Sequence, residues 1–242
     1  MNLIIDAGNT SVKLAIFKKT EIIHLESVAT SDFVAAVKII FKSYPKIESA
    51  IISSVGALSK EQMNVLAIFC EVHELSNTSK VPFKNSYASP QTLGVDRLAL
   101  ATAAFYFNPH HNNLIIDAGT CITYDMLNDF DEYLGGSISP GVQMRYNAMH
   151  NQTAKLPLLE KVELLDYIGN TTENCMHSGV INGVILEIDG LIDLYKSRFK
   201  DLTIILTGGD TLFLSKRLKN TIFADSKFLL KGLNYLLEYN KH

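Results

Sequence analysis

The chain has 242 residues, of which 47% are hydrophobic and 19% are charged, and its formal net charge is −3 at pH 7. This is enough apolar material for one large core or two modest ones, and the near-neutral balance lacks the basic face of a dedicated nucleic-acid binder. No stretch reaches the roughly 18 uncharged apolar residues that a membrane-spanning helix requires. We therefore expect neither a nucleic acid nor a membrane as a partner.

The start of the sequence and its cysteines indicate a compartment. The segment MNLIIDAGNT has no basic region and its apolar run is broken at Asp6, so it does not resemble a signal peptide. Cys70, Cys121 and Cys175 are odd in number and widely spaced, which fits neither a disulfide framework nor a zinc site. We expect a cytoplasmic protein.

The first half alternates predicted strands and helices. Short apolar or alternating runs predict strands at 2–5, 11–17, 22–28, 50–55 and 72–75. Apolar residues at helical spacing predict helices at 33–44 and about 59–69, the first with Ser31 or Asp32 as its cap and the second with Ser59. This order predicts a mixed sheet with helices on its faces.

A polar segment without periodicity, Ser76 to Thr92, separates this half from a predicted helix at 96–107. Loops this long inside compact proteins are often functional. The second half then predicts strands from 113, at 121–127, 133–139 and 202–206. Its helices are predicted from about 142, near 172–199 and at about 226–239.

The phrase LIIDAG occurs twice, at Leu3–Gly8 and at Leu114–Gly119, and each copy is followed by a further apolar stretch. A repeat near half the chain length predicts two similar domains rather than a solenoid. We expect an α/β architecture of two βββαβα domains, one over residues 1–110 and the other over 111–242.

The segment DAGNTSVK has the composition of a phosphate-binding loop. Small residues after a strand let backbone N–H groups approach an anion, hydroxyls add donors, and Lys13 adds a positive charge. Asp6 can hold Mg²⁺ directly or through water. A tight hairpin turn with Asp6 as a local cap explains the same residues. The residues proposed to bind ATP here are Asp6, Gly8, Asn9, Thr10, Ser11, Val12 and Lys13.

Two further phrases extend this pattern. DAGTCITYD repeats the first loop and places Thr120 where the first copy has Asn9 or Thr10, although an ancestral turn without function also explains it. TGGD follows an apolar strand, and its glycines Gly208 and Gly209 allow adenine and ribose to lie against the backbone. A plain strand-to-helix turn is the alternative for TGGD.

In this order the three phrases resemble the superfamily of sugar kinases, heat-shock-70 proteins and actin. That resemblance covers the whole chain and implies a duplicated ribonuclease-H-like fold with ATP in a cleft between the halves. Within the superfamily, four separated segments look like type III pantothenate kinase: YASPQTLGVDRLA, GGSISPG, TAKLP and GNTTENCMHSG. This family phosphorylates pantothenate in the first step of coenzyme A synthesis.

The resemblance also implies roles for individual residues. Asp96 is the expected general base, and a carboxylate near the start of a helix is suited to orient an alcohol. Arg97 can pair with the pantothenate carboxylate, although a solvated charge at a helix start also explains the pair. The implied pantothenate contacts are Tyr87, Gly94, Val95, Asp96, Arg97 and, from a partner subunit, Thr172.

The family resemblance further implies a homodimer and a monovalent cation, K⁺ or NH₄⁺, at Asp117. Thr171 precedes Thr172, so the threonine that contacts the substrate can be either of the two. Two other functions remain open from the sequence: another small-molecule kinase of the superfamily, and a non-catalytic accessory factor in transcription. The segment Pro90–Arg97 favours pantothenate over other acceptors.

Overall fold

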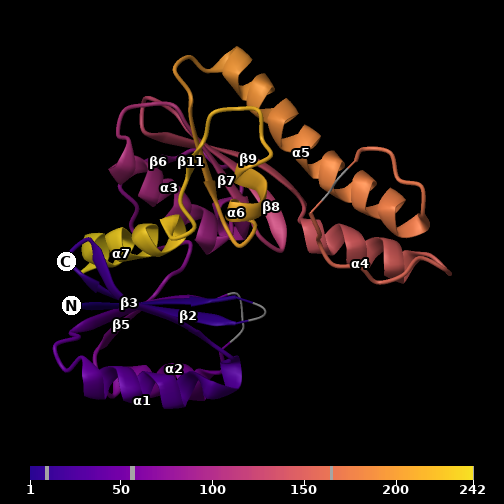
Figure 1. Cartoon of the computed structure of the whole chain (residues 1–242). Coiled ribbons are helices and arrows are strands. Elements are labelled where there is room, and N and C mark those ends of the chain that lie inside the picture. Colours follow the sequence, from indigo (N-terminus) through magenta and orange to yellow (C-terminus); the bar gives the residue numbers. More distant parts are fainter. Residues whose placement is uncertain (9–10, 55–57, 164–165, 242) are drawn as a thin grey trace. The chain divides into compact units, whose positions relative to one another are not determined.

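The computed structural model describes residues 1–8, 11–54, 58–163 and 166–241 (Figure 1). Its internal contacts define two units. The first unit consists of Met1–Phe107 together with Phe228–His242, and the second of Asn108–Lys227. The C-terminal helix thus groups with the first unit, whereas the sequence placed it in a domain from 111 to 242. The division into two domains at residue 110 stays a prediction.

The first unit contains a five-stranded mixed sheet in the order β3-β2-β1-β4-β5. Its strands are β1 (Asn2–Ala7), β2 (Val12–Lys18), β3 (Glu21–Val28), β4 (Ser49–Ser54) and β5 (Glu71–Glu74). Strand β1 pairs with β2 in antiparallel fashion and with β4 in parallel fashion. The mixed sheet predicted from the sequence is therefore present.

Helices cover both faces of this sheet. The helices of the unit are α1 (Phe33–Ser43), α2 (Lys60–Ala67), α3 (Val95–Phe107) and α7 (Phe228–Asn240). Leu3 and Ile5 of β1 pack in the cluster that contains α1 and α2 side chains, whereas Ile4 packs in the cluster that contains Leu233 of α7. Figure 1 shows α1 and α2 on one side of the strands and α7 on the other. The unbroken apolar run of β1 follows from this burial on both faces.

One predicted helix cap is present and one is absent. Ser59 caps α2 with a capping box, in which Gln62 N donates to Ser59 Oγ at 3.2 Å and Ser59 N donates to Gln62 Oε1 at 2.9 Å. The predicted side-chain cap of α1 is wrong for Asp32. A 3-10 turn over Thr30–Asp32 leads into α1, so Asp32 already has helical backbone angles and makes no capping hydrogen bond.

Between α2 and α3, the long polar segment carries only a short strand, β6 (Lys84–Asn85), and a 3-10 turn at Pro90–Thr92. The turn contains Pro at its start, which suits its fixed φ. This segment leads directly into the first turn of α3. It therefore brings Tyr87 and Gly94 to the start of that helix.

The second unit contains its own mixed sheet, with the order β11-β10-β7-β8-β9. The strands are β7 (Asn113–Ala118), β8 (Cys121–Leu127), β9 (Glu132–Pro140), β10 (Thr203–Thr207) and β11 (Phe223–Ala224). The helices are α4 (Val142–Gln152), α5 (Thr172–Arg198) and α6 (Thr211–Ser215). Strand β7 pairs antiparallel with β8 and parallel with β10, as β1 does with β2 and β4.

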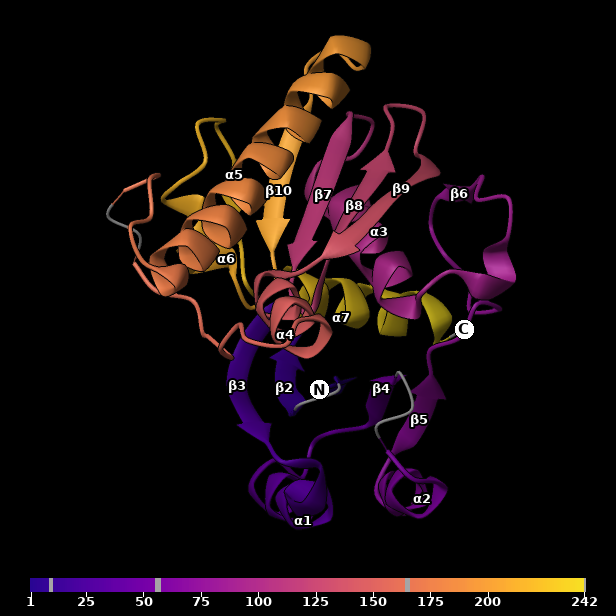
Figure 2. The same cartoon turned by 90° about the vertical axis from the view of Figure 1, so that its right-hand side faces the viewer.

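Helix α5 is the one helix of the described residues that is long and apolar enough to cross a membrane by length and composition. Val184, Ile188 and Ile192 of this helix are fully buried in the core of the second unit, together with Leu114 and Ile116 of β7. Figure 2 shows α5 lying beside the strands of its own sheet. The helix is apolar because this stripe of side chains is buried in the core of the unit.

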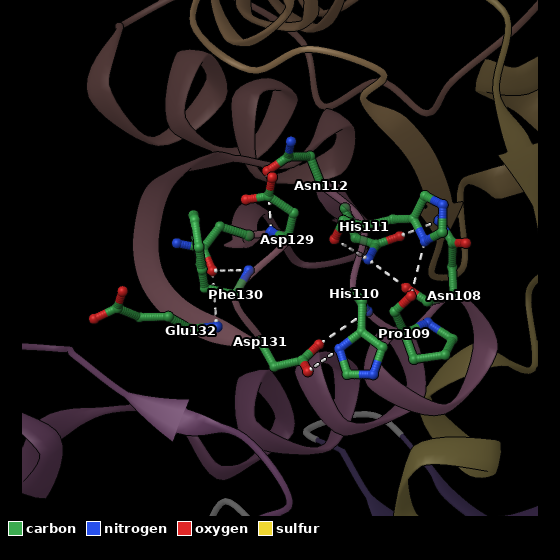
Figure 3. A network of polar contacts seen from close by, with 11 residues as sticks. Asn108, Pro109, His110, His111, Asn112, Asp129, Phe130, Asp131 and Glu132 are labelled. Atoms are coloured by element: carbon green, nitrogen blue, oxygen red, sulfur yellow. Dashed lines mark hydrogen bonds and ion pairs between the residues drawn. The ribbon is translucent and has the colours of Figure 1, made fainter.

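Polar contacts anchor the start of β7 (Figure 3). His110 donates its backbone N–H to Asp131 Oδ1 at 3.0 Å, and its Nδ1 lies 2.6 Å from the other carboxylate oxygen. Asp129 N donates to Asn112 Oδ1 at 3.2 Å. The loop before β7 is thereby tied to the β8–β9 turn, at the opposite end of β7 from Asp117.

Candidate functional site

The first LIIDAG copy ends in a hairpin that pairs a carboxylate with an ammonium group. Asp6 lies directly opposite Lys13 in the β1–β2 register, and Lys13 Nζ is 3.6 Å from Asp6 Oδ2. The Asp6 side chain is only 17% exposed, whereas Lys13 is 45% exposed. Asn9 and Thr10, which the sequence assigns to ATP, lie outside the described residues.

The electrostatics around Asp6 point to a neighbouring acid. Burial raises the pKa of Asp6, Lys13 lowers it, and the negative charge of Asp96 raises it again. The net effect is a raised pKa. Asp96 belongs to the same unit as Asp6, and its charge is the smallest of these influences on the pKa of Asp6.

Asp96 occupies the first turn of α3. Its Oδ1 accepts a hydrogen bond from the Arg97 backbone N–H at 2.9 Å. Arg97 N also donates to Gly94 O at 3.1 Å. A Cβ on Gly94 would lie 2.4 Å from Asp96 Oδ1, so this carboxylate packs over the backbone of residue 94. Val95, assigned to pantothenate, is the first residue of the helix.

Arg97 and Tyr87 lie together in the same unit. The guanidinium carbon of Arg97 is 5.7 Å from the centre of the Tyr87 ring, and Arg97 is 4% exposed. The backbone N–H of Tyr87 donates to Asn85 Oδ1 at 3.0 Å, which fixes the chain before the tyrosine. The structure therefore brings Tyr87 and Arg97 together, and their assignment to the substrate stays a prediction.

The remaining loop residues differ in what they can offer a phosphate. Val12 is fully buried in the core, so only its backbone is left for a ligand. Gly8 N donates to Ser11 O at 3.1 Å within the turn, so this N–H is already used. The Ser11 hydroxyl and the Lys13 ammonium are the side-chain groups of the described part of this loop that suit an anion.

In the second LIIDAG copy, the aspartate faces a different residue across the strand pair, and the turn is shorter. Asp117 lies opposite Thr123 in the β7–β8 register, where the first copy has Lys13. Gly119 N donates to Cys121 O at 2.9 Å, which makes this turn one residue shorter than the Gly8–Ser11 turn. Thr120 is the exposed residue inside it.

The TGGD segment packs against this second turn. Gly208 has φ +96°, and a Cβ there would lie 2.3 Å from Ala118 O and 2.4 Å from Asp117 Oδ1. Asp210 N donates to Ala118 O at 2.9 Å. Gly209 has open space around its Cα. Gly208 is therefore required by the fold, and only Gly209 leaves room for a flat ligand.

The two threonines at the start of α5 have different surroundings. Thr171 is the N-cap residue, and its Oγ1 accepts a hydrogen bond from Asn174 N at 3.1 Å. Thr172 is the first helical residue, and its hydroxyl has no such role. Both line an open pocket of about 670 Å³, together with Met149, Leu156, Cys175 and Met176.

Mg²⁺ is bound by oxygen ligands. Within the described ranges, no group of three or more His, Cys, Asp or Glu side chains could hold a metal ion. A single carboxylate such as Asp6 suits Mg²⁺ that arrives on phosphate oxygens and keeps several waters. At Asp117, the carboxylate oxygen Oδ1 and the Ala118 carbonyl oxygen both lie against Gly208, and the carbonyl already accepts a hydrogen bond from Asp210 N.

Some residues near these groups were missed in the sequence. Lys161 forms an ion pair with Asp210 of the TGGD segment. Gly141 N donates to Thr120 O at 3.0 Å, so the end of GGSISPG contacts the second turn. The GGSISPG motif was the available signal for Gly141, but spacing alone did not show which turn it would contact.

Comparisons with known proteins agree with the motifs. The family model for type III pantothenate kinase matches residues 2–194. Proteins named type III pantothenate kinase from Flavobacterium psychrophilum and Christiangramia forsetii are each 47% identical over 241 residues; they cover 100% of this chain and 100% and 99% of their own lengths. One from Bacteroides fragilis is 39% identical and covers 99% of this chain and 98% of its own.

Solved structures share the fold. A Baf family protein from Campylobacter jejuni matches with a TM-score of 0.64 at 21% identity, over 98% of each chain. A glucokinase from an Antarctic psychrotroph matches with a TM-score of 0.53 at 13% identity, also over 98% of each chain. With the repeated strand arrangement, these matches confirm the duplicated ribonuclease-H-like α/β fold that was expected from the sequence.

Proposed function

The chain belongs to the type III pantothenate kinase family, and from this premise we propose that it phosphorylates pantothenate with ATP. The product is 4′-phosphopantothenate, and the reaction is the first step of coenzyme A synthesis. The observation that carries the proposal is the Asp6–Lys13 ion pair at the first turn, in the unit that also holds Asp96 in the first turn of α3. A base, a magnesium ligand and a phosphate-binding cation are the groups that phosphoryl transfer to an alcohol needs.

Asp96 is proposed as the general base. It orients the primary hydroxyl of pantothenate and accepts its proton as the oxygen forms a bond to the γ-phosphorus. The bond between that phosphorus and the oxygen bridging to the β-phosphate breaks, and ADP leaves with that oxygen. The hydrogen bond from Arg97 N holds the Asp96 carboxylate in place before the substrate arrives.

Arg97 is proposed to bind the pantothenate carboxylate through two parallel hydrogen bonds. The Tyr87 ring, whose centre lies 5.7 Å from the guanidinium carbon, supports this role because both residues are assigned to the same substrate. Gly94 and Val95 contribute contacts at the same helix start. Thr172 is the proposed contact from a partner subunit in a homodimer, and the use of the Thr171 hydroxyl as a helix cap supports Thr172 over Thr171.

ATP is proposed to bind through groups of both phosphate loops. In the first loop, Asp6 holds Mg²⁺ through water and Lys13 neutralises phosphate charge; the 45% exposure of the Lys13 side chain supports the second role. Gly8, Asn9, Thr10, Ser11 and the Val12 backbone complete that loop. In the second unit, Thr120 supplies a hydroxyl and Gly209 lies against adenosine, while Gly208 shapes the turn that places Gly209.

Asp117 is proposed as the ligand of a monovalent cation, K⁺ or NH₄⁺. Its cross-strand partner is a threonine rather than a lysine, so the second copy lacks the built-in ammonium group of the first. A bound cation would supply the missing positive charge near Thr120. We further propose a cytoplasmic homodimer that binds neither nucleic acid nor membrane.

An ADP-release assay tests this function. Purified protein is incubated with Mg·ATP and pantothenate, with and without K⁺, while reactions without pantothenate measure background hydrolysis. We expect ADP release that depends on pantothenate and increases with K⁺. Absence of pantothenate-dependent turnover in both salts contradicts the proposal. Glucose in place of pantothenate serves as a second acceptor, and turnover with glucose alone would favour a sugar kinase of the superfamily.

A further inference from the structure

A cluster of polar side chains in the second unit ties three elements to helix α5. Glu187 of α5 accepts hydrogen bonds from Ser139 of β9 at 2.5 Å and from Tyr124 of β8 at 3.2 Å. Its other oxygen accepts from Nη2 of Arg145 in α4 at 2.5 Å. The Glu187 carboxylate thus joins α5 to β8, β9 and α4.

Arg145 extends this cluster to the backbone. While Nη2 donates to Glu187, Nε donates to the Pro140 carbonyl oxygen at 2.9 Å. The planar guanidinium can make both bonds at once because its donors point in fixed directions. Arg145 therefore bridges the carboxylate on α5 and the last residue of β9.

The end of β9 packs directly on the turn that contains Thr120. Gly141 N donates to Thr120 O at 3.0 Å, and a Cβ on Gly141 would lie 2.2 Å from Gly119 O. No side chain intervenes between these two backbone segments. A displacement of Pro140 and Gly141 therefore displaces the Thr120 turn as well.

The cluster is sheltered enough for its charges to matter. The side chains of Arg145 and Glu187 are only 21% and 27% exposed. Burial raises the pKa of Glu187, but the hydrogen bonds from Arg145 and Ser139 outweigh it and hold the pKa below its usual range. Glu187 is therefore ionised at neutral pH, and the cluster is a fixed ion pair rather than a solvated surface contact.

We propose that Arg145 and Glu187 are positioning residues that hold the Thr120 turn in the geometry required for ATP. The inference rests on the proposed role of Thr120 as a phosphate ligand and extends it to residues that touch no substrate. It also connects that turn to α5, the helix that begins at Thr172.

Steady-state kinetics with two substitutions at Arg145 test the bridge. Arg145→Lys keeps the charge but replaces two donor nitrogens in a fixed plane by one flexible ammonium nitrogen, and Arg145→Met removes both hydrogen bonds. We expect the KM for ATP to rise about tenfold in both variants, with kcat and the KM for pantothenate within about twofold of wild type. A loss confined to kcat would indicate damaged folding instead and would overturn the proposal, as would a normal KM for ATP in Arg145→Lys.

Asp193→Asn is the matched control. Asp193 lies on the same helix and pairs with Lys219 at 2.7 Å, so its removal breaks an ion pair on α5 that makes no contact with β9. Its kinetic constants should equal those of the wild type. An equal rise in the KM for ATP in this control would show that any loss of charge on α5 has the effect, and would overturn the proposal.

A measurement without substrate separates this inference from the proposed function. Amide exchange at Gly141, whose N–H bonds Thr120 O, should be at least about fivefold faster in Arg145→Lys than in wild type or Asp193→Asn. An unchanged rate of amide exchange at Gly141 would overturn the positioning role of Arg145, even if the protein is a pantothenate kinase. Thr120→Val tests the other premise: a normal KM for ATP in that variant refutes the phosphate contact, and the bridge then carries no role in ATP binding.

Discussion

Asp117 Oδ1 lies 2.4 Å from the point at which Gly208 would carry a Cβ atom. Because Gly208 also has φ +96°, we expect Gly208→Ala to lower the free energy of unfolding by about 2–3 kcal/mol through strain and overlap. Chemical denaturation measures the change. Gly209→Ala is the matched control, since its Cα has open space, and its stability should stay within about 0.5 kcal/mol of wild type. Equal losses in both variants would refute the packing argument.

Asp96→Asn removes the proposed base while keeping the size of the side chain. We expect kcat to fall by about 10²–10⁴-fold, because general base catalysis typically contributes that much. Binding of Mg·ATP, measured by calorimetry, should persist. Asp32→Asn, at an exposed carboxylate of the same unit, serves as the control and should retain full turnover. Normal turnover in Asp96→Asn would show that another group takes the proton.

Two substitutions should shift the pKa of Asp6 in opposite directions. Lys13 lowers this pKa and Asp96 raises it, so Lys13→Met should raise the pKa further and Asp96→Asn should lower it. NMR titration of the Asp6 carboxyl carbon in the protein without ligands measures both. Lys18→Met, at an exposed position of β2, the strand that carries Lys13, should leave the pKa of Asp6 unchanged. Shifts of the same sign in the two variants would mean that the Asp6 and Asp96 carboxylates do not interact.

Asp6→Asn should stabilise the protein and inactivate it. A carboxyl group whose pKa is raised on folding, here mainly by burial, destabilises the fold when it is ionised. At pH 7 the Asn variant should therefore melt about 2 °C higher. The difference should shrink as the pH falls through the folded pKa and vanish below 3.8, the unfolded value, because Asp6 is then protonated in both states. A lower melting temperature at pH 7 would contradict the sign of the shift.

The two threonines at the start of α5 should separate stability from substrate binding. Thr171→Ala removes a helix cap and should cost about 1 kcal/mol of unfolding free energy, with little effect on the KM for pantothenate. Thr172→Ala should leave stability nearly unchanged and raise that KM about tenfold. Denaturation and steady-state kinetics on both variants decide the assignment. The reverse result would place the substrate contact at Thr171.

The strands and helices could be predicted well because their signals are local. The predicted strand at 121–127 matches β8, and the predicted helices at 33–44 and 96–107 match α1 and α3 to within a residue or so. The prediction of an Asp32 side-chain cap for α1 was wrong because a 3-10 turn before a helix leaves no clear pattern in the sequence. The short elements α6 and β11 were not predicted, since so few residues carry no periodicity.

The site was predictable where a motif marks it and obscure where packing decides it. Asp6 and Asp96 were found from separate phrases, but the effect of the Asp96 charge on the pKa of Asp6 depends on how α3 packs in the first unit. The difference between Gly208 and Gly209 depends on the approach of Ala118, which no spacing reveals. Arg145 and Glu187 are ordinary residues on two helices, and only the folded chain joins them to each other and joins Arg145 to Pro140.

Helix α7 comes last in the chain, yet it supplies Leu230, Leu233 and Leu237 to a core shared with Ile4 and Ile51. Asn234 also accepts a hydrogen bond from Asn2 at 2.7 Å, which joins the two ends of the sequence. Leu75 and Ala99 belong to the same core, but it stays incomplete during synthesis until the whole second unit has left the ribosome and α7 follows. The second unit emerges as an uninterrupted segment and can complete its own core first, so the N-terminal unit of this enzyme family member is the last to finish folding.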